Sequence, residues 1–426
     1  MADISSFSAA MKTKFIGPIR DQLNSNKILL FGLRTTDGSK SQPETHASKD
    51  FKGIVADSTG IDFVGNDFRM PLRTGRNQGT GPRGESATLP APGKQGYQYI
   101  TDGLKYFYGL FNITGPLLKA SDSNEGAFRK ALQAEMEGLT DDLKRHVNLQ
   151  AYGSGNGVLA TITTGTTSAT QPVDTTIYFQ GGEYVDIYDS TLTTYRGSAS
   201  LSVVSINRSG LLLVLSSSIA TTTGDVLIRA SSDSVSATPN NDKGQAINGL
   251  GNIVSATGAL HGLNPATAGQ SFWSSQSIAA SSAVVGDSLL RQLKDGIGFE
   301  SGNDTDTVLI TTRGIRNRYA NTLTALKRFN DAQSVTLHGG FQALMFDETP
   351  MVIDDHCPLG TVFALNTQAM FWSQMSDWEW MDNDGDVLKW ESRMDRYVGI
   401  IFKYCNLGTW ARNRHGKITG AADDVK

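Results

Sequence analysis

The sequence is poor in cysteine and has no long hydrophobic run, and each shortage excludes a class of protein. Only Cys357 and Cys405 occur in 426 residues, far apart and outside any metal-binding spacing, which excludes a disulfide-stapled domain. No apolar run approaches the roughly 18 residues of a membrane span, and residues 1–10 lack the pattern of a signal peptide. We therefore expect a protein that is made and kept in cytoplasm, with reduced thiols and no membrane partner.

Charge is also scarce. Charged residues make up 19% of the chain, against about 25% in typical globular domains, and Gly, Ser and Thr take their place. The formal net charge is -4, whereas a protein that grips phosphate backbones normally carries clustered Lys and Arg. This balance disfavours tight DNA binding and favours strands and loops, distributed over several packed units because 426 residues exceed what one core usually serves.

The first 112 residues predict projecting segments. Residues 1–49 are polar around one apolar cluster, Ile28–Phe31, and cannot form a core alone, so we expect an extended arm that lies on another surface. Residues 50–112 predict a β-hairpin, because widely spaced apolar residues lead into a tip at 75–95 that is dense in Gly, Pro and Arg. The returning strand, predicted over 98–114, is rich in Tyr and Phe, so a second surface should cover its rings.

The tip contains a formal G-x-G-x-x-G at Gly79, Gly81 and Gly84. Pro82 lies inside the motif, and no strand-to-helix passage surrounds it. A dinucleotide site needs that βαβ setting, so the pattern does not predict one.

The clearest helix signal covers 122–150. Asp122 can cap it with Glu125 three residues later, and one apolar stripe runs its whole length, which predicts a rod of roughly 43 Å at 1.5 Å per residue. His146 near its end is more typical of a packing or surface residue than of a metal ligand. Glycines between 153 and 157 end the helix.

A different composition follows over 158–232, where turn signals separate short strands with almost no helical periodicity. A small inserted β-barrel accounts for this best. An oligonucleotide-binding role is disfavoured, because the stretch offers only Arg196, Arg208 and Arg229 for phosphates. The predicted strands are 176–179, 184–188, 200–207, 211–215 and 225–229.

Helical and extended segments then alternate, as in an α/β unit. We predict helices at 278–294 and 313–328, and strands at 307–312 and 334–337. In the second helix Ile315, Tyr319, Leu323 and Leu326 form the core face. The other face carries the basic residues Arg313, Arg316, Arg318, Lys327 and Arg328. This basic face is either solvated or a seam that pairs with acidic residues of a neighbouring copy.

The last polar clusters resemble metal or catalytic sites, but their settings favour structural roles. Three extended runs, 378–381, 387–392 and 398–404, meet at the Asp-rich turn 382–386, where Gly385 is fourth and Arg393 twelfth, so the spacing of an EF-hand is missing. Residues 354–357, Asp-Asp-His-Cys, occupy a strand-to-turn corner where neighbours point to opposite faces. No other catalytic motif appears, so we expect neither enzyme activity nor a cofactor or metal.

Several strings in this order resemble one family. They are Glu-Ser-Ala-Thr-Leu-Pro at 85–90, Leu-Gln-Ala-Tyr-Gly-Ser-Gly at 149–155, the late segment 340–354 with Pro-Leu-Gly at 358–360, and residues 408–420. Together with the order of segments, they resemble the major capsid proteins of tailed double-stranded-DNA bacteriophages, whose fold also builds encapsulin shells.

The resemblance implies an α+β, HK-ninety-seven-like major capsid fold. Its parts would be an N-terminal arm (1–49), an extended loop (50–112), a peripheral domain with a spine helix (113–157), an inserted β-barrel (158–232), an axial domain (233–375), closing strands of the peripheral domain (376–405) and a C-terminal return to the axial domain (406–426).

The function implied is a structural subunit that assembles as hexamers and pentamers of an icosahedral virion shell in the host cytoplasm. Portal, separate scaffolding and decoration proteins would be partners, and double-stranded DNA would be enclosed but weakly bound. The alternatives are an encapsulin-type compartment and, from another class, an adhesin or tail fibre, which an amphipathic helix and an α/β unit disfavour. Candidate contacts between copies are Arg73, Arg76, Arg83, Tyr99, Tyr106, Phe107, Tyr108, Arg316 and Arg318.

Overall fold

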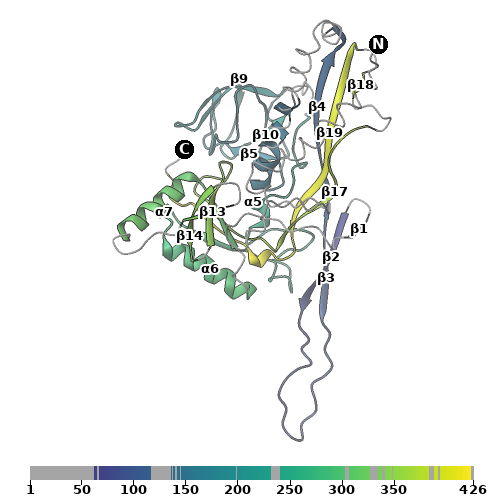
Figure 1. The fold of residues 1–426 in the computed structure, drawn as a ribbon, viewed down its shortest axis with the longest axis vertical. Coiled ribbons are helices and arrows are strands. Elements are labelled where there is room, and N and C mark those ends of the chain that lie inside the picture. The colour runs from purple at the N-terminus through teal and green to yellow at the C-terminus, as the bar shows by residue number, and fades with distance from the viewer. Residues whose placement is uncertain are drawn as a thin grey trace.

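The computed structural model describes residues 62–64, 67–116, 136, 138–139, 142–143, 145–197, 199–231, 240–302, 307–326, 334–337, 341–347, 349–382, 388–391 and 394–423. The predicted arm at 1–49 and most of the Asp-rich turn lie outside these residues. Figure 1 shows two long projections on one side of the molecule and two compact units on the other. None of the described helices is long and apolar enough to cross a membrane.

The lower projection is the predicted hairpin. Strand β2 (Asp67–Gly75) pairs antiparallel with β3 (Gly96–Gly103), and the short β1 (Asp62–Val64) pairs with the other edge of β2. Residues 76–95 form the extended tip, without a helix or strand (Figure 1). The hairpin prediction is confirmed, but the returning strand is interrupted at Leu104, where the chain leaves the hairpin for another sheet.

The upper projection, here called the long sheet, has β19 (Arg396–Thr409) at its centre. β4 (Lys105–Thr114) pairs with one side of β19, while β17 (Met370–Trp380) and β18 (Leu388–Trp390) share the other. All three extended runs predicted near the end of the chain thus lie in strands, but β17 begins eight residues earlier than expected and β19 extends beyond the prediction at both ends.

The described residues of the predicted spine helix, from Met136 to Tyr152, are helical, and the helix ends before the glycines as expected. Its first half lies outside the described residues. Leu139 and Leu143 pack so closely on the long sheet that a Cβ at Gly109 would collide with them and with Ile401. The missing side chain at Gly109 is therefore what lets the helix approach the strand.

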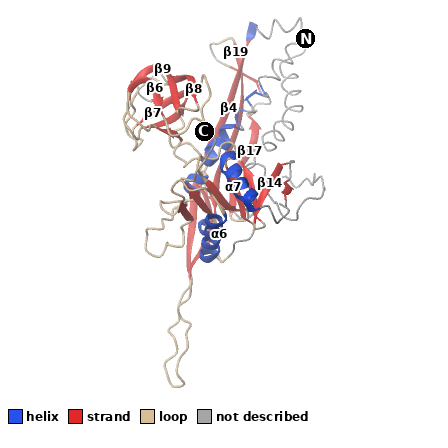
Figure 2. Ribbon diagram, turned by 90° about the vertical axis from the view of Figure 1, so that its left-hand side faces the viewer, coloured by secondary structure: helices blue, strands red, loops and turns tan. Residues whose placement is uncertain are grey.

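The predicted barrel is present. Its sheet follows the order β5-β10-β7-β8-β9-β6, and a bridge between Ile162 and Val173 joins the two outer strands, so that no long edge stays open. Figure 2 shows it as a closed unit set beside the long sheet. Its strands are β5 (Val158–Thr161), β6 (Thr167–Pro172), β7 (Tyr184–Tyr188), β8 (Leu201–Asn207), β9 (Leu212–Ala220) and β10 (Val226–Ala230).

One strand predicted in the barrel is wrong. Residues 176–179 form a turn, in which the Phe179 N–H donates to the Thr176 carbonyl and Arg208 donates to the same oxygen. The residues that suggested a strand pack into the core of the barrel instead, and the Phe179 ring is fully buried there. Strands β5 and β6 were not predicted, since Ser, Thr and Ala give them little alternation of apolar and polar residues.

The second compact unit is a seven-stranded mixed sheet in the order β11-β20-β16-β12-β15-β14-β13. Helices α6 (Asp287–Ser301) and α7 (Arg313–Leu326) pack on one face, against Leu309, Met351 and Ala364. The strands are β11 (Gln276–Ala279), β12 (Thr307–Thr311), β13 (Ser334–Leu337), β14 (Phe341–Phe346), β15 (Thr349–Ile353), β16 (Val362–Asn366) and β20 (Gly416–Thr419).

The helix predicted from residue 278 is wrong at its start. Ile278 lies in β11, opposite Ile418 of β20, and α6 begins only at Asp287. Ser281 and Ser282 have φ angles of 48° and 64°, so the chain turns there before the helix starts. The helix prediction failed here because the apolar residues of a strand and the following turn happen to be spaced as in a helix.

The opposite face of this sheet joins the core of the long sheet, with Val308, Ile310 and Phe363 pointing toward it. Here the fully buried Arg412 ties the connecting segment, which includes the short helix α5 (Leu250–Ile253), to the end of the chain. Its guanidinium, whose pKa burial lowers to about 10, donates only to backbone carbonyls, those of Asn252, Ile253, Thr257, Gly258 and Trp273.

Candidate assembly surfaces

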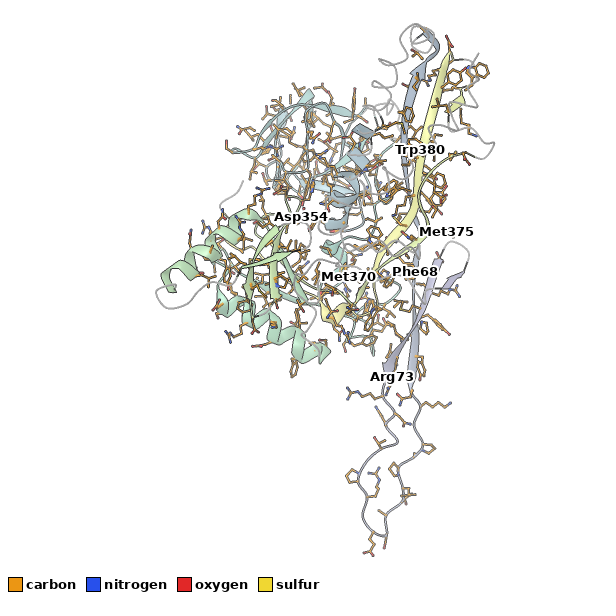
Figure 3. The ribbon with its side chains drawn as sticks, viewed as in Figure 1. Phe68, Arg73, Asp354, Met370, Met375 and Trp380 are labelled. Atoms are coloured by element: carbon orange, nitrogen blue, oxygen red, sulfur yellow. The ribbon has the colours of Figure 1, made fainter. Side chains whose placement is uncertain are left out.

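The hairpin presents one face of aromatic and basic side chains. Arg73 stands opposite Tyr97 and Pro71 opposite Tyr99, and because opposite residues of an antiparallel pair share a face, all four point the same way. Both tyrosines are 66% exposed. Figure 3 shows Arg73 at the point where the paired strands give way to the tip, in which Arg76 and Arg83 are also exposed. The predicted candidates Arg73 and Tyr99 therefore lie together.

The base of the hairpin is locked to the core through His261. The Thr409 N–H donates to its Nε2 at 3.3 Å, so Nδ1 carries the proton and donates to Asp102 of β3 at 2.9 Å. The His261 carbonyl accepts from Thr101, and its ring packs edge-on against Phe68 with centroids 5.4 Å apart. These contacts fasten the base of the hairpin, where Figure 3 labels Phe68, and the paired strands extend from there away from the two compact units.

The outer face of β4 carries exposed rings. Tyr106 is 45% exposed, Tyr108 51% and Leu110 58%, and both tyrosines contact Tyr404 on β19, with centroids 5.2 and 6.2 Å away. Burial and the neighbouring Tyr404 raise the pKa of Tyr108, so its hydroxyl stays neutral. The strand thus places Tyr106 and Tyr108 side by side, with Leu110 extending the band.

Phe107 needs a correction. It was grouped with the exposed tyrosines, but only 6% of its surface is exposed, and its ring contacts His146 and Trp378 within the same chain. The reason is the two-residue period of a strand, which turns Phe107 to the face opposite Tyr106 and Tyr108. We therefore withdraw it as a contact residue.

The basic residues of α7 are spread over different environments. Arg313 makes a bidentate ion pair with Asp355, at 2.7 and 2.8 Å, and so holds the pKa of that carboxyl below its ordinary value. Arg316 contacts the Asn317 amide and pairs with no described carboxylate. Arg318 is half-buried, and Lys327 and Arg328 lie outside the described residues.

The polar corner at 354–357 is a joint between three parts of the molecule. Asp354 accepts from the backbone N–H of His356 at 2.9 Å and from Asn148 of the spine helix at 3.2 Å. Burial raises the pKa of Asp354, but the hydrogen bonds from His356 outweigh it, so the pKa lies below its ordinary value. Tyr178 of the barrel donates to the His356 carbonyl, and Asp355 points away to Arg313. Figure 3 places Asp354 between the two compact units.

The barrel is also fastened to the C-terminal part of the spine helix. Arg145 contacts Glu183 at 2.5 Å and donates to the Tyr178 carbonyl at 2.8 Å. His146 lies 2.8 Å from Asp242 and 2.7 Å from Arg229 of β10. This histidine is therefore a packing residue, as the sequence favoured. Within the described part of the chain, no group of three or more His, Cys, Asp or Glu residues could hold a metal ion.

The arrangement can be compared with solved structures. The capsid subunit of cyanophage A-1(L) matches 92% of this chain and 98% of its own, with a TM-score of 0.54 and 12% identity. The chain has the fold of a phage capsid subunit. At this identity the likeness concerns the fold alone, and the expectation of a capsid fold is confirmed to that extent.

Two further capsid-like shells are similar at lower scores. The capsid of a native GTA particle matches 91% of this chain and 96% of its own at 11% identity, with a TM-score of 0.45. The SrpI encapsulin of Synechococcus elongatus matches 84% of this chain and 83% of its own at 9% identity, with a TM-score of 0.41. No protein-family model matches the sequence, and no curated protein matches it.

On this capsid fold, the predicted contact residues form three separate groups: the hairpin face with its tip, the outer face of β4, and α7. Sequence reasoning missed Tyr97, Leu110 and Tyr404, which complete the first two. A usable signal was present for Tyr97 and Leu110, because each lies two positions from a predicted tyrosine and so shares its face.

Proposed function

We propose that the chain is the major capsid protein of a tailed double-stranded-DNA phage. The observation that carries this proposal is the combination of a capsid-subunit fold with projections that leave aromatic rings exposed, because one copy alone cannot bury them. Assembly as hexamers and pentamers of an icosahedral shell would cover these surfaces, since each subunit repeats the same contacts around symmetry axes.

In this proposal each unit has a place in the shell. The hairpin is the extended loop, and the long sheet with the spine helix is the peripheral domain. The seven-stranded sheet with α6 and α7 is the axial domain, joined by the returning strand β20. The barrel is an insertion that braces its own subunit through Arg145 and His146.

The hairpin would contact a neighbouring copy. Its tip extends beyond the paired strands and carries Arg76, Arg83 and Lys94 against the single acid Glu85, so it favours an acidic surface. Tyr97 and Tyr99 on its exposed face would supply apolar area at the same contact. Arg316 and Arg318 of α7 form a second candidate contact, with acidic residues of a neighbour around the axis.

The remaining partners follow from a capsid role. A portal protein, a separate scaffolding protein and a decoration protein would join the shell, which would assemble in the host cytoplasm and persist in the virion. The enclosed DNA would be bound weakly, because the formal net charge of -4 provides no basic field for phosphates. The chain would have no catalytic role.

Negative-stain microscopy of the purified full-length chain, expressed with and without the phage genes beside it, tests the proposal. Closed icosahedral shells are expected, with nuclease-resistant DNA inside when packaging genes are present. Shells that enclose a protein cargo and never DNA would instead identify an encapsulin-type compartment, the alternative function of the same fold. Failure to form shells under either condition would overturn the capsid proposal.

A further inference from the structure

Strand β4 has one hydrogen-bonding edge that no described residue occupies. It pairs with β19 from Lys105 opposite Cys405 to Thr114 opposite Arg396, without a register shift. In an antiparallel pair, every second residue directs its N–H and C=O away from the partner strand. Within the described part of the chain no backbone group accepts or donates at that side. A regular row of unpaired backbone groups therefore runs along β4.

Other strand edges in the described structure are blunted. β1, β11, β13 and β18 have only three or four residues, and the barrel closes on itself. β17 is irregular, with two register shifts in its pairing with β19, and carries the exposed Glu379, while the edge of β3 is interrupted where Thr101 donates to His261. Such devices are how proteins prevent unwanted strand pairing.

Beyond Lys105, its first residue, β4 carries none of these devices. Residues 106–114, Tyr-Phe-Tyr-Gly-Leu-Phe-Asn-Ile-Thr, contain no proline and no charge, and the strand has no bulge. Tyr106, Tyr108 and Leu110 stand exposed beside the open edge. A strand added there would gain backbone hydrogen bonds and bury part of each of these side chains, as in β-strand addition.

Residues 27–33, Lys-Ile-Leu-Leu-Phe-Gly-Leu, match this edge chemically. Within an otherwise polar segment of 49 residues, every residue from Ile28 to Phe31 is apolar, and such a run suits a strand covered on both faces. Residues 34–61 separate this run from β1 and would span up to about 90 Å when extended, enough to leave the subunit.

We propose that residues 27–33 of a second copy add as a strand to the free edge of β4. A second copy is the proposed source because residues 34–61 are long enough to carry the run away from its own subunit. The inference rests on the proposed shell, which brings copies together. It assigns the arm a defined acceptor strand and explains why β4 is left unprotected while its neighbours are blunted.

Cysteine pairs test the proposal in the full-length chain. Leu110→Cys or Tyr108→Cys is combined in turn with Ile28→Cys, Leu29→Cys, Leu30→Cys and Phe31→Cys, and the assembled particles are oxidised mildly. Covalent dimers are expected on a non-reducing gel at least about tenfold more often for one alternating pair, 28 and 30 or 29 and 31, because strand residues alternate between faces. The native Cys357 and Cys405 are buried and do not compete.

Val204→Cys on the exposed surface of the barrel, combined with the same arm cysteines, is the matched control and should give no dimer. Shells without crosslinks, crosslinks within one chain, or equal crosslinking at all four arm positions would overturn the inference and leave the proposed function standing. A chain that forms no shell would overturn both.

Hydrogen exchange of the unmodified protein gives a second readout that needs no variant. About half of the β4 amides should exchange rapidly in dilute unassembled subunits and become protected in shells, while barrel amides change little. β4 amides with the same exchange rates in both states would refute strand addition.

Discussion

The barrel and the long sheet are both antiparallel, but they treat their edges and faces differently. The barrel closes through the Ile162–Val173 bridge and surrounds its own core, in which Phe179 is fully buried. The long sheet buries one face and exposes Tyr106 and Tyr108 on the other, and no described residue pairs with the outer edge of β4. The difference teaches that one part of the molecule buries its own core in a single copy, while the other leaves rings exposed that the proposed shell would cover.

The largest expected effect is confined to the barrel. Phe179→Ala should lower the free energy of unfolding of the barrel by about 3–5 kcal/mol, because it leaves a cavity in a closed core. All six tryptophans lie outside residues 158–231, so their fluorescence reports the rest of the chain. Urea unfolding should show an earlier transition by circular dichroism and an unchanged one by fluorescence. Val204→Ala, at an exposed position of β8, is the control, and an equal shift of both probes would contradict the comparison.

Acid should weaken the rest of the chain more than the barrel, which contains no histidine. Burial lowers the pKa of His415 to about 3, with a smaller contribution from Arg414. The unfolded chain therefore takes up a proton below about pH 6.5 that the folded chain refuses, so stability is complete above that pH and declines toward pH 3.

At pH 5 the loss should be about 2 kcal/mol relative to pH 7, read from tryptophan fluorescence in urea. Carboxylates whose pKa is lowered in the folded state titrate below pH 5, so they contribute little to the change in stability between pH 7 and pH 5. His415→Gln should flatten the dependence, because a glutamine does not titrate. A variant that retains the full slope would exclude His415 as its origin.

A smaller effect is expected at the joint between the two parts. Arg145→Ala removes the contacts to Glu183 and the Tyr178 carbonyl, both half-buried, and should cost about 1–2 kcal/mol. The circular dichroism and fluorescence transitions should then move apart relative to the unmodified chain, because the barrel is less tightly coupled to the spine helix. Arg145→Lys, which keeps the charge, should retain part of the coupling. Transitions that stay together in Arg145→Ala would show that the joint lies elsewhere.

The smallest effect on the subunit should come from the exposed rings. Tyr106→Ser with Tyr108→Ser should change the free energy of unfolding by less than about 1 kcal/mol, since both side chains are half exposed. The same change should raise the concentration needed for assembly at least about tenfold, measured by light scattering. The buried neighbour provides the contrast: Phe107→Ala should destabilise the subunit itself by about 3–5 kcal/mol. Normal assembly of the double tyrosine variant would remove this face from the interface.

The sequence predicted those parts of the fold in which a local pattern decides the structure. Turn residues and apolar periods that tertiary contacts did not override were enough to predict the hairpin, the barrel, the strand at 334–337 and the corner at 354–357. The start of α6 failed, because Ile278 finds its place only through pairing with Ile418 on a distant strand. Strands β5 and β6 depend on barrel closure and leave little local signal.

The candidate contact residues were predicted as residue types rather than as faces. The tyrosines and the tip arginines were chosen because their composition is unusual for a free surface, and the structure shows that Tyr99, Tyr106 and Tyr108 are exposed. Phe107 was misassigned because aromatic content was counted without strand alternation, and Tyr404 was missed because only the register with β4 brings it beside Tyr106. Residues adjacent through such long-range pairing cannot be grouped from sequence spacing.

Light scattering of the purified full-length chain over a range of concentrations, with the proposed scaffolding protein present, tests the central claim most directly. Dependence of the projections on sister copies predicts a threshold concentration, above which particles of one size form. A strict monomer at every concentration, with the hairpin and the β4 edge covered by the chain's own residues, would contradict it.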